Sequence, residues 1–129
     1  LIIQGLKRYE FRGWPAPRHL WGRRIAIHAG ARPPKRAEVL DLIRRLEHDG
    51  AYGQAMEPAG SLALLRGAVN NLAELPISSV LGTAVLGKPL TPDQVRAELA
   101  NDSDRDAHFN WAWPLTDIRE LRPFVPARG

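Results

Sequence analysis

Residues 5–15, Gly-Leu-Lys-Arg-Tyr-Glu-Phe-Arg-Gly-Trp-Pro, interleave charged and aromatic side chains. Side chains of a strand alternate between its two faces, so Tyr9 and Phe11 point to one face. The opposite face then carries three charged side chains: Arg8, Glu10 and Arg12. This alternation is typical of a half-buried strand with a solvated face. The same polar face also suits an anion or a nucleobase, because Arg donates through a planar fork, Glu accepts hydrogen bonds and aromatic rings stack on bases.

The positive charge of the chain is concentrated near its start. Residues 1–36 contain nine Lys or Arg and one acid, a formal charge of +8. The other 93 residues contain nine Lys or Arg and thirteen acids, which gives −4 and a total of +4. A basic segment of this kind favours a polyanionic partner. Arg outnumbers Lys there and is the better phosphate ligand, although the same bias is typical of a GC-rich coding sequence.

Composition limits the class of protein. The 129 residues are enough for one domain with one core, and a hydrophobic content of 44% is typical of a globular chain. Cysteine is absent, no apolar run reaches the ~20 residues of a membrane span, and no signal peptide is visible. We therefore expect a cytoplasmic protein without a membrane partner. The four histidines lack metal-ligand spacing and no Gly-rich phosphate loop occurs, so we expect no metal and no cofactor.

Apolar periodicity, prolines and glycines predict an α+β chain. The expected elements are the end of a Gly-capped helix over 1–6, strands over 7–13 and 23–29, a loop over 14–22, a helix over 35–48, a loop over 51–61, a weaker helix over 62–75, a strand over 77–87, a short helix capped by Thr91, a polar loop over 101–108 and a last strand within 109–122. Gly82 predicts a bulge or a close backbone approach, and Pro114 an edge strand or a bulge.

The same patterns predict which side chains form the core. Alternation in the first two strands buries four of them: Tyr9, Phe11, Ile25 and Ile27. The helix over 35–48 presents an apolar stripe at helical spacing, with Leu42 at its margin. The other members of the stripe are Val39, Leu40, Ile43 and Leu46.

Four motifs in order carry a family resemblance. Leu-Ile-Ile-Gln-Gly-Leu-Lys-Arg-Tyr-Glu-Phe-Arg-Gly-Trp is followed by Trp-Gly-Arg-Arg-Ile-Ala-Ile-His-Ala, Leu-Gly-Thr-Ala-Val-Leu and Trp-Ala-Trp-Pro-Leu-Thr-Asp-Ile-Arg-Glu-Leu. Together they resemble the ASCH family of the PUA-like superfamily over most of residues 1–126. The resemblance implies one domain over residues 1–129, a PUA-like open β-barrel with helices packed around it. In the family a further strand precedes the position of Leu1 and a closing strand follows that of Gly129, so the resemblance implies a domain truncated at one or both ends.

The resemblance also implies a cleft beside the first strand and a function in RNA or modified-nucleoside binding. The Lys, Glu and Arg of the family motif fall on Lys7, Glu10 and Arg12. Some small family members resemble amidohydrolases acting on N(4)-acetylcytidine with a Lys, a Thr and a Glu. The Thr of those members lies three residues after the Lys, a position that Glu10 occupies here.

Three functions stay open at this point. The first is an RNA- or nucleotide-binding module, in which arginines attract phosphate and Trp14 or Trp113 stacks on a base. Its candidate ligand-binding residues are Lys7, Arg8, Glu10, Arg12, Trp14, Arg18, Arg23, Arg24 and Trp113. The second is a small amidohydrolase for acetylated cytidine or a related nucleoside, with Lys7 as proton carrier and Glu10 as general acid or base. The third is a protein-docking domain whose charged face is structural.

Overall fold

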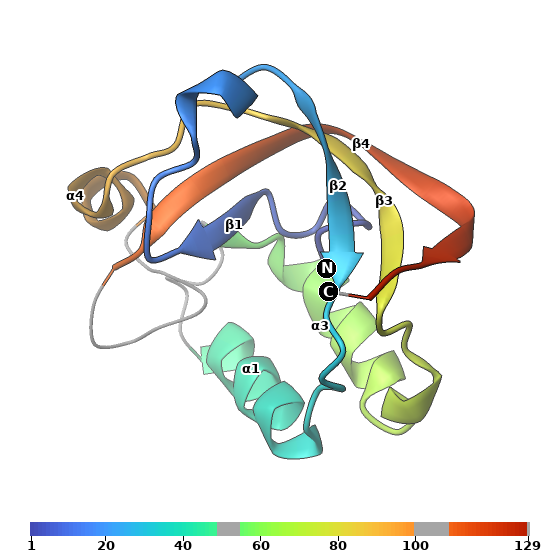
Figure 1. Cartoon of the computed structure of the whole chain (residues 1–129). Coiled ribbons are helices and arrows are strands. Elements are labelled where there is room, and N and C mark those ends of the chain that lie inside the picture. Colours follow the sequence, from blue (N-terminus) through green and yellow to red (C-terminus); the bar gives the residue numbers. More distant parts are fainter. Residues whose placement is uncertain (49–54, 100–108, 129) are drawn as a thin grey trace.

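A computed structural model describes residues 1–48, 55–99 and 109–128 and has an α+β architecture. Its sheet contains four antiparallel strands in the order β1-β4-β3-β2. Their bounds are Tyr9–Arg12 for β1, Arg24–Ala29 for β2, Ser79–Leu86 for β3 and Trp111–Pro126 for β4. Figure 1 shows that the sheet curls into a half-barrel, with β1 and β2, its two edge strands, facing the same interior. The α+β class and a barrel-like sheet are therefore confirmed.

The longest of these strands, β4, pairs with two neighbours, β1 and β3. Its first residues pair with β1, in a register that sets Pro114 opposite Tyr9. Its later residues pair with β3, from Leu115 opposite Leu86 onward. The expectation that Pro114 marks an edge strand is wrong, because β4 lies between two neighbours. Pro114 stands where the pairing partner of β4 changes, and its carbonyl accepts from Gly87 N–H at 2.9 Å.

Gly82 confirms the expected close approach and irregular pairing. The β3–β4 register shifts between Val80 and Gly82. A Cβ at Gly82 would lie 2.3 Å from the carbonyl oxygen of Arg119, so no other residue fits without a backbone shift. A second register shift, between Thr83 and Val85, faces Asp117, which has φ +44°. Asp is among the residues that tolerate this left-handed conformation.

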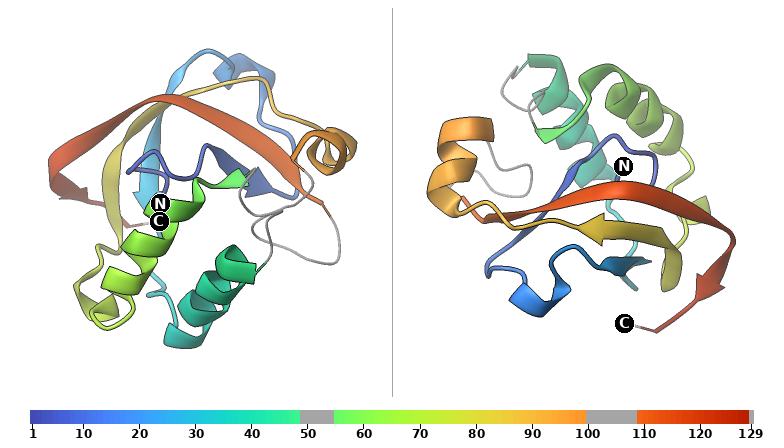
Figure 2. Two further views of the ribbon diagram at one scale, coloured as in Figure 1. Left: turned by 180° about the vertical axis from the view of Figure 1, so that it is seen from behind. Right: turned by 90° about the horizontal axis from the view of Figure 1, so that it is seen from above.

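Two helices pack against each other beside the sheet (Figures 1 and 2). The first, α1, spans Arg36–His48, and three of its predicted stripe residues are buried: Val39, Ile43 and Leu46. Leu40 is 45% exposed, so its place in the stripe is a wrong prediction; it lies just outside the face that meets α3. Leu42 packs at the margin of this cluster.

The second helix, α3, spans Pro58–Ala68 and begins four residues before the predicted 62. Glu57 caps it, since its carboxylate accepts from the N–H groups of Ala59 and Gly60. Of the remaining residues of the predicted helix over 62–75, only Leu72–Glu74 are helical, in a 3₁₀ turn. Residues 51–54 of the predicted loop, and the polar loop over 101–108, lie outside the described residues.

Local signals place the other short elements. Thr91 caps α4, Pro92–Gln94, in a capping box with Gln94, and a π-helical segment, Val95–Leu99, follows. The predicted loop over 14–22 contains a 3₁₀ turn, Arg18–Leu20. Residues 1–6 form a turn and contain no helix, but the predicted cap at Gly5 is present. The Leu6 N–H bonds the Leu1 carbonyl and the Gly5 N–H bonds the Ile2 carbonyl, with Gly5 at φ +71°, which is the hydrogen-bond pattern of a Gly cap.

The core confirms the predicted alternation in β1 and β2 in part. Phe11 is buried at 3% exposure, and Tyr9 packs half-buried beside it with ring centroids 6.5 Å apart. Ile25 and Ile27 are half-buried against the inner face of the sheet, where Ala84, Leu86 and Leu115 form a buried cluster. Among the residues that the structure describes, no helix is long and apolar enough to cross a membrane.

Candidate functional site

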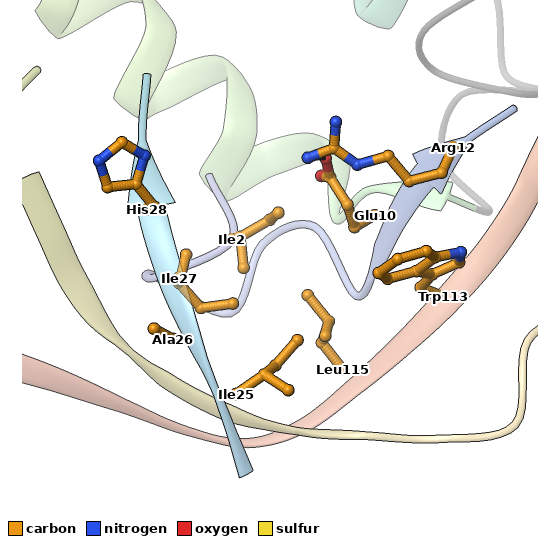
Figure 3. A pocket seen from close by; sticks show the side chains of 9 residues that line it. All are labelled: Ile2, Glu10, Arg12, Ile25, Ala26, Ile27, His28, Trp113 and Leu115. Atoms are coloured by element: carbon orange, nitrogen blue, oxygen red, sulfur yellow. Dashed lines mark ion pairs between the residues drawn. The ribbon is translucent and has the colours of Figure 1, made fainter. Parts of the chain in front are cut away.

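A cavity of about 160 Å³ opens between the two edge strands, on the inner side of the curled sheet (Figure 3). Its volume matches the roughly 150 Å³ of an apolar cavity that binds benzene, so it has room for one ring. The lining residues come from the N-terminal turn, β1, β2 and β4: Ile2, Glu10, Arg12, Ile25, Ala26, Ile27, His28, Trp113 and Leu115.

The floor of the cavity is aliphatic. Ile25 and Ile27 face inward from β2 because they are two residues apart in a strand, and Leu115 faces them from β4. Ile2 reaches the same space from the N-terminal turn. These side chains present an apolar surface on which the flat face of a ring can rest.

The rim on the β1 side is charged. Glu10 and Arg12 lie on the same face of β1, and their Oε1 and Nη2 atoms are 2.8 Å apart. Their side chains are 26% and 48% exposed, so the pair borders solvent and cavity together. An arginine fork has five N–H donors, more than one carboxylate oxygen can occupy. The rim therefore offers donors from Arg12 and acceptors from Glu10 to a bound molecule.

Lys7 contacts the carboxylate of this rim but does not line the cavity. Its Nζ lies 3.9 Å from Glu10 Oε2 and 5.4 Å from the centre of the Phe11 ring. The Lys7 side chain is only 12% exposed. Glu10 thus stands between two cations, and the rim carries one net positive charge.

One of the two candidate stacking residues reaches the cavity. Trp113 lines it, and its indole N–H donates to the Trp14 carbonyl at 3.0 Å, which fixes the orientation of the ring. The Trp14 side chain is 58% exposed and is not among the lining side chains. Trp14 therefore positions Trp113 through its backbone.

Arg24 lies on the opposite, outer face of the sheet. It alternates with inward-facing Ile25 and donates to Thr83 Oγ1 at 3.0 Å and to the Asp117 carboxylate. Arg119 also donates to that carboxylate, at 2.9 and 3.2 Å. These hydrogen bonds from Arg119, together with the charge of Arg24, hold the pKa of the Asp117 carboxyl below its usual value. We call Arg24, Thr83, Asp117 and Arg119 the outer cluster.

The remaining predicted arginines are exposed and do not line the cavity. Arg18 lies over the Trp21 ring at 5.9 Å, and the Nε–H of Arg23 donates to the His19 carbonyl at 3.1 Å. Both belong to the connection between β1 and β2. Arg8 lies on β1's N-terminal side, where its carbonyl accepts from Leu115 N–H.

Sequence reasoning missed His28 and the aliphatic floor. His28 and Ala26 border the cavity from the edge of β2, but their side chains lie on the opposite face of the strand from Ile25 and Ile27 (Figure 3). The signal for His28 was present in the Ile-Ala-Ile-His-Ala motif, but four histidines without metal spacing gave no reason to choose one. Within the described residues, no group of three His, Asp or Glu side chains is placed to hold a metal ion.

Comparison with known proteins adds no relative. No family model matches the chain, and no curated protein matches it. The resemblance to the ASCH family therefore rests on the motifs of the sequence alone, and the function must be argued from the site.

Proposed function

We propose that this chain is an RNA- or nucleotide-binding module of the ASCH type that seats one base in the cavity between β1 and β2. One observation carries the proposal: a space for a single ring is bordered by the Glu10–Arg12 pair and by Trp113. An ion pair of this kind matches the donors and acceptors on the edge of a base, and an aromatic side chain supplies stacking. The curled sheet is compatible with a PUA-like open barrel, which is part of the same proposal.

Calorimetric titration with the four ribonucleoside 5′-monophosphates tests this function. We expect weak binding of at least one of them, and Arg12→Ala should weaken it by about 1–3 kcal/mol, the range for hydrogen bonds to a charged group. The matched control is Arg119→Ala, which removes an arginine with the same kind of carboxylate partner from the outer cluster. Equal losses in both variants, or no binding by the wild type, would contradict the proposal.

Binding of single-stranded RNA tests the contribution of phosphates. Affinity should fall as salt rises, because each phosphate contact releases counterions. Arg23→Ala should flatten this dependence more than Arg24→Ala, since Arg24 is already paired with Asp117. An affinity that does not change with salt would remove RNA from the proposal and leave a nucleotide.

The Lys7–Glu10 pair at 3.9 Å favours a second candidate, an amidohydrolase for acetylated cytidine. In that case Lys7 carries a proton and Glu10 acts as general acid or base. Chromatography of acetylated cytidine incubated with the protein tests it. We expect no deacetylation, because Glu10 replaces the Thr of the hydrolase-like pattern; turnover that Lys7→Ala abolishes would make this candidate the function.

A further inference from the structure

The strand β2 has a free edge. Among the described residues it pairs with β3 on one side and has no partner strand on the other. The other edge strand, β1, is covered at its start, where Lys7 bridges Met56 and the Glu57 N–H donates to the Leu6 carbonyl at 2.8 Å. An uncovered edge strand is a template on which another chain can pair. The free edge of β2 is therefore a candidate interaction surface.

A hydrogen bond at the start of β2 shows which residues point to this edge. The Leu86 N–H of β3 donates to the Arg23 carbonyl at 2.9 Å. Alternate residues of an antiparallel strand bond the same neighbour, so Ile25 also bonds β3. The N–H and C=O groups of Arg24 and Ala26 point away from β3, and within the described ranges they have no hydrogen-bond partner. An added strand can bond these groups without breaking a hydrogen bond of the sheet.

A strand added at this edge would direct side chains toward the cavity. Side chains of directly opposite residues lie on the same face of a sheet. Residues opposite Ile25 and Ile27 would therefore lie on the inner face, where these two isoleucines and Leu115 form the floor of the cavity. The inner face of β2 carries no charged residue and no proline, the features that commonly prevent such pairing. The cavity thus fits an aliphatic side chain of an extended segment.

Positive charge borders the free edge on both faces of the sheet. On the outer face Arg24 and Arg119 share the carboxylate of Asp117, so two cations face one anion. On the inner face the rim of the cavity also carries one net positive charge. Exposed Arg23, at the start of the strand, donates to a carbonyl rather than to a carboxylate. An acidic segment complements these charges, whereas a second copy of this chain, with a net charge of +4, repels them.

We propose that the free edge of β2 binds an extended acidic segment of a partner protein as an additional antiparallel strand. The segment alternates aliphatic residues, which point into the cavity, with acidic residues, which lie beside Arg24 on the outer face. Main-chain hydrogen bonds to Arg24 and Ala26 supply affinity, and the alternate side chains supply specificity. The pairing is antiparallel, as in every other pair of this sheet. This inference goes beyond the proposed function and does not depend on it.

The probe is the fluorescein-labelled peptide Glu-Val-Glu-Val-Glu-Val-Glu, titrated by fluorescence anisotropy. We expect binding with a Kd below about 1 mM. The matched peptide in which every Glu is replaced by Lys should bind about 10-fold more weakly or less, because like charges then meet at the edge. Equal binding of the two peptides, or no binding of the acidic one, overturns the proposal.

N-methylated peptides test the main-chain hydrogen bonds on the wild-type protein. Peptide residues opposite Arg24 and Ala26 direct their N–H groups toward β2, and those opposite Ile25 direct them away. Methylation of the central Glu nitrogen should therefore weaken binding about 10-fold, since it removes a hydrogen bond and adds a steric clash. Methylation of the adjacent Val nitrogen is the control and should have little effect. Similar losses for the two peptides would exclude strand addition.

A proline substitution tests the same bonds from the side of the protein. Ala26→Pro removes an N–H at the free edge and no hydrogen bond to β3, and proline is tolerated at such positions. It should weaken binding of the acidic peptide about 10-fold while the urea midpoint stays at the wild-type value. Ala31→Pro, in the exposed bend after β2, is the matched control and should bind as wild type. Unchanged peptide binding by a folded Ala26→Pro variant contradicts the proposal.

Amide hydrogen exchange, followed by NMR, locates the peptide on the wild-type protein. The acidic peptide should slow exchange of the Ala26 amide, whereas the Ile25 amide, already bonded to β3, should exchange slowly with and without peptide. Slowing confined to other strands would place the peptide elsewhere and refute the inference. Analytical ultracentrifugation should show a monomer; a dimer that Ala26→Pro dissociates would assign the edge to a second copy instead. Failure of the peptide leaves the proposed nucleotide binding standing, because calorimetry tests that function separately.

Discussion

The inner and the outer face of the curled sheet each hold arginine paired with a carboxylate, and the two pairs have different surroundings. On the inner face Glu10 and Arg12 border a cavity of about 160 Å³ with an aliphatic floor. On the outer face Asp117 pairs with Arg24 and Arg119 in solvent, beside no cavity among those described. An exposed ion pair contributes little free energy, whereas donors and acceptors beside a concave apolar space can orient a ligand. The number of arginines is therefore a weaker guide to function than the surroundings of each arginine–carboxylate pair.

The largest difference between the faces should appear in stability. Leu115, at 4% exposure, forms the floor of the cavity, and Thr116 is exposed on the other side of β4. Leu115→Ala should lower the free energy of unfolding by about 2–5 kcal/mol, because it removes packed atoms and enlarges a cavity. Thr116→Ala, the control at the next position, should change it by less than about 0.5 kcal/mol. Urea denaturation measures both, and similar losses would mean that the two faces are packed alike.

A smaller difference should appear when each carboxylate is neutralised. Glu10→Gln leaves Lys7 and Arg12 without their shared anion at the rim of the cavity. Adenosine monophosphate should then bind roughly 3- to 10-fold more tightly, equivalent to about 0.7–1.4 kcal/mol. Asp117→Asn also frees two arginines but on a surface without a cavity, and calorimetry should show no change. If only Asp117→Asn bound adenosine monophosphate more tightly, the ligand would bind to the outer face of the sheet and the proposal for the cavity would be wrong.

The smallest effect concerns the acid stability of the outer cluster. The pKa of Asp117 is lowered by Arg119 and, secondarily, by Arg24. A carboxyl with a lowered folded-state pKa stabilises the fold above its unfolded pKa, and this contribution disappears as pH falls through the folded value. Asp117→Asn should therefore lower the urea midpoint slightly at pH 7, and its difference from wild type should shrink progressively as pH falls below about 4. A difference that grows in acid would contradict the assignment of the pKa shift to these arginines.

Local patterns predicted local structure well. The burial of Phe11, the cap at Thr91 and the close approach at Gly82 depend on a few neighbouring residues, and all three are confirmed. The exposed Leu40 was predicted wrongly because helical periodicity defines a stripe but not its width. That width depends on where α3 packs, which is a property of residues distant in sequence.

Only part of the candidate site, the Glu10–Arg12 pair, could be predicted from the sequence. Glu10 and Arg12 share a strand face, so their pairing follows from spacing. The approach of Trp113, Leu115 and His28 to that pair depends on the order β1-β4-β3-β2, which no local pattern encodes. Pro114 illustrates the limit: its missing N–H predicted an edge strand or a bulge, but β4 lies inside the sheet, and Pro114 stands where β4 passes from pairing with β1 to pairing with β3.

The length and central place of β4 also set an order of events during synthesis. Strand β1 finds its partner, and Arg24 finds Asp117, only after roughly a hundred further residues have been translated, a delay of about 5–20 s at typical elongation rates. Until then the basic first quarter of the chain lacks a carboxylate that later neutralises part of it. The first quarter of the nascent chain is thus more cationic than the same segment in the folded protein.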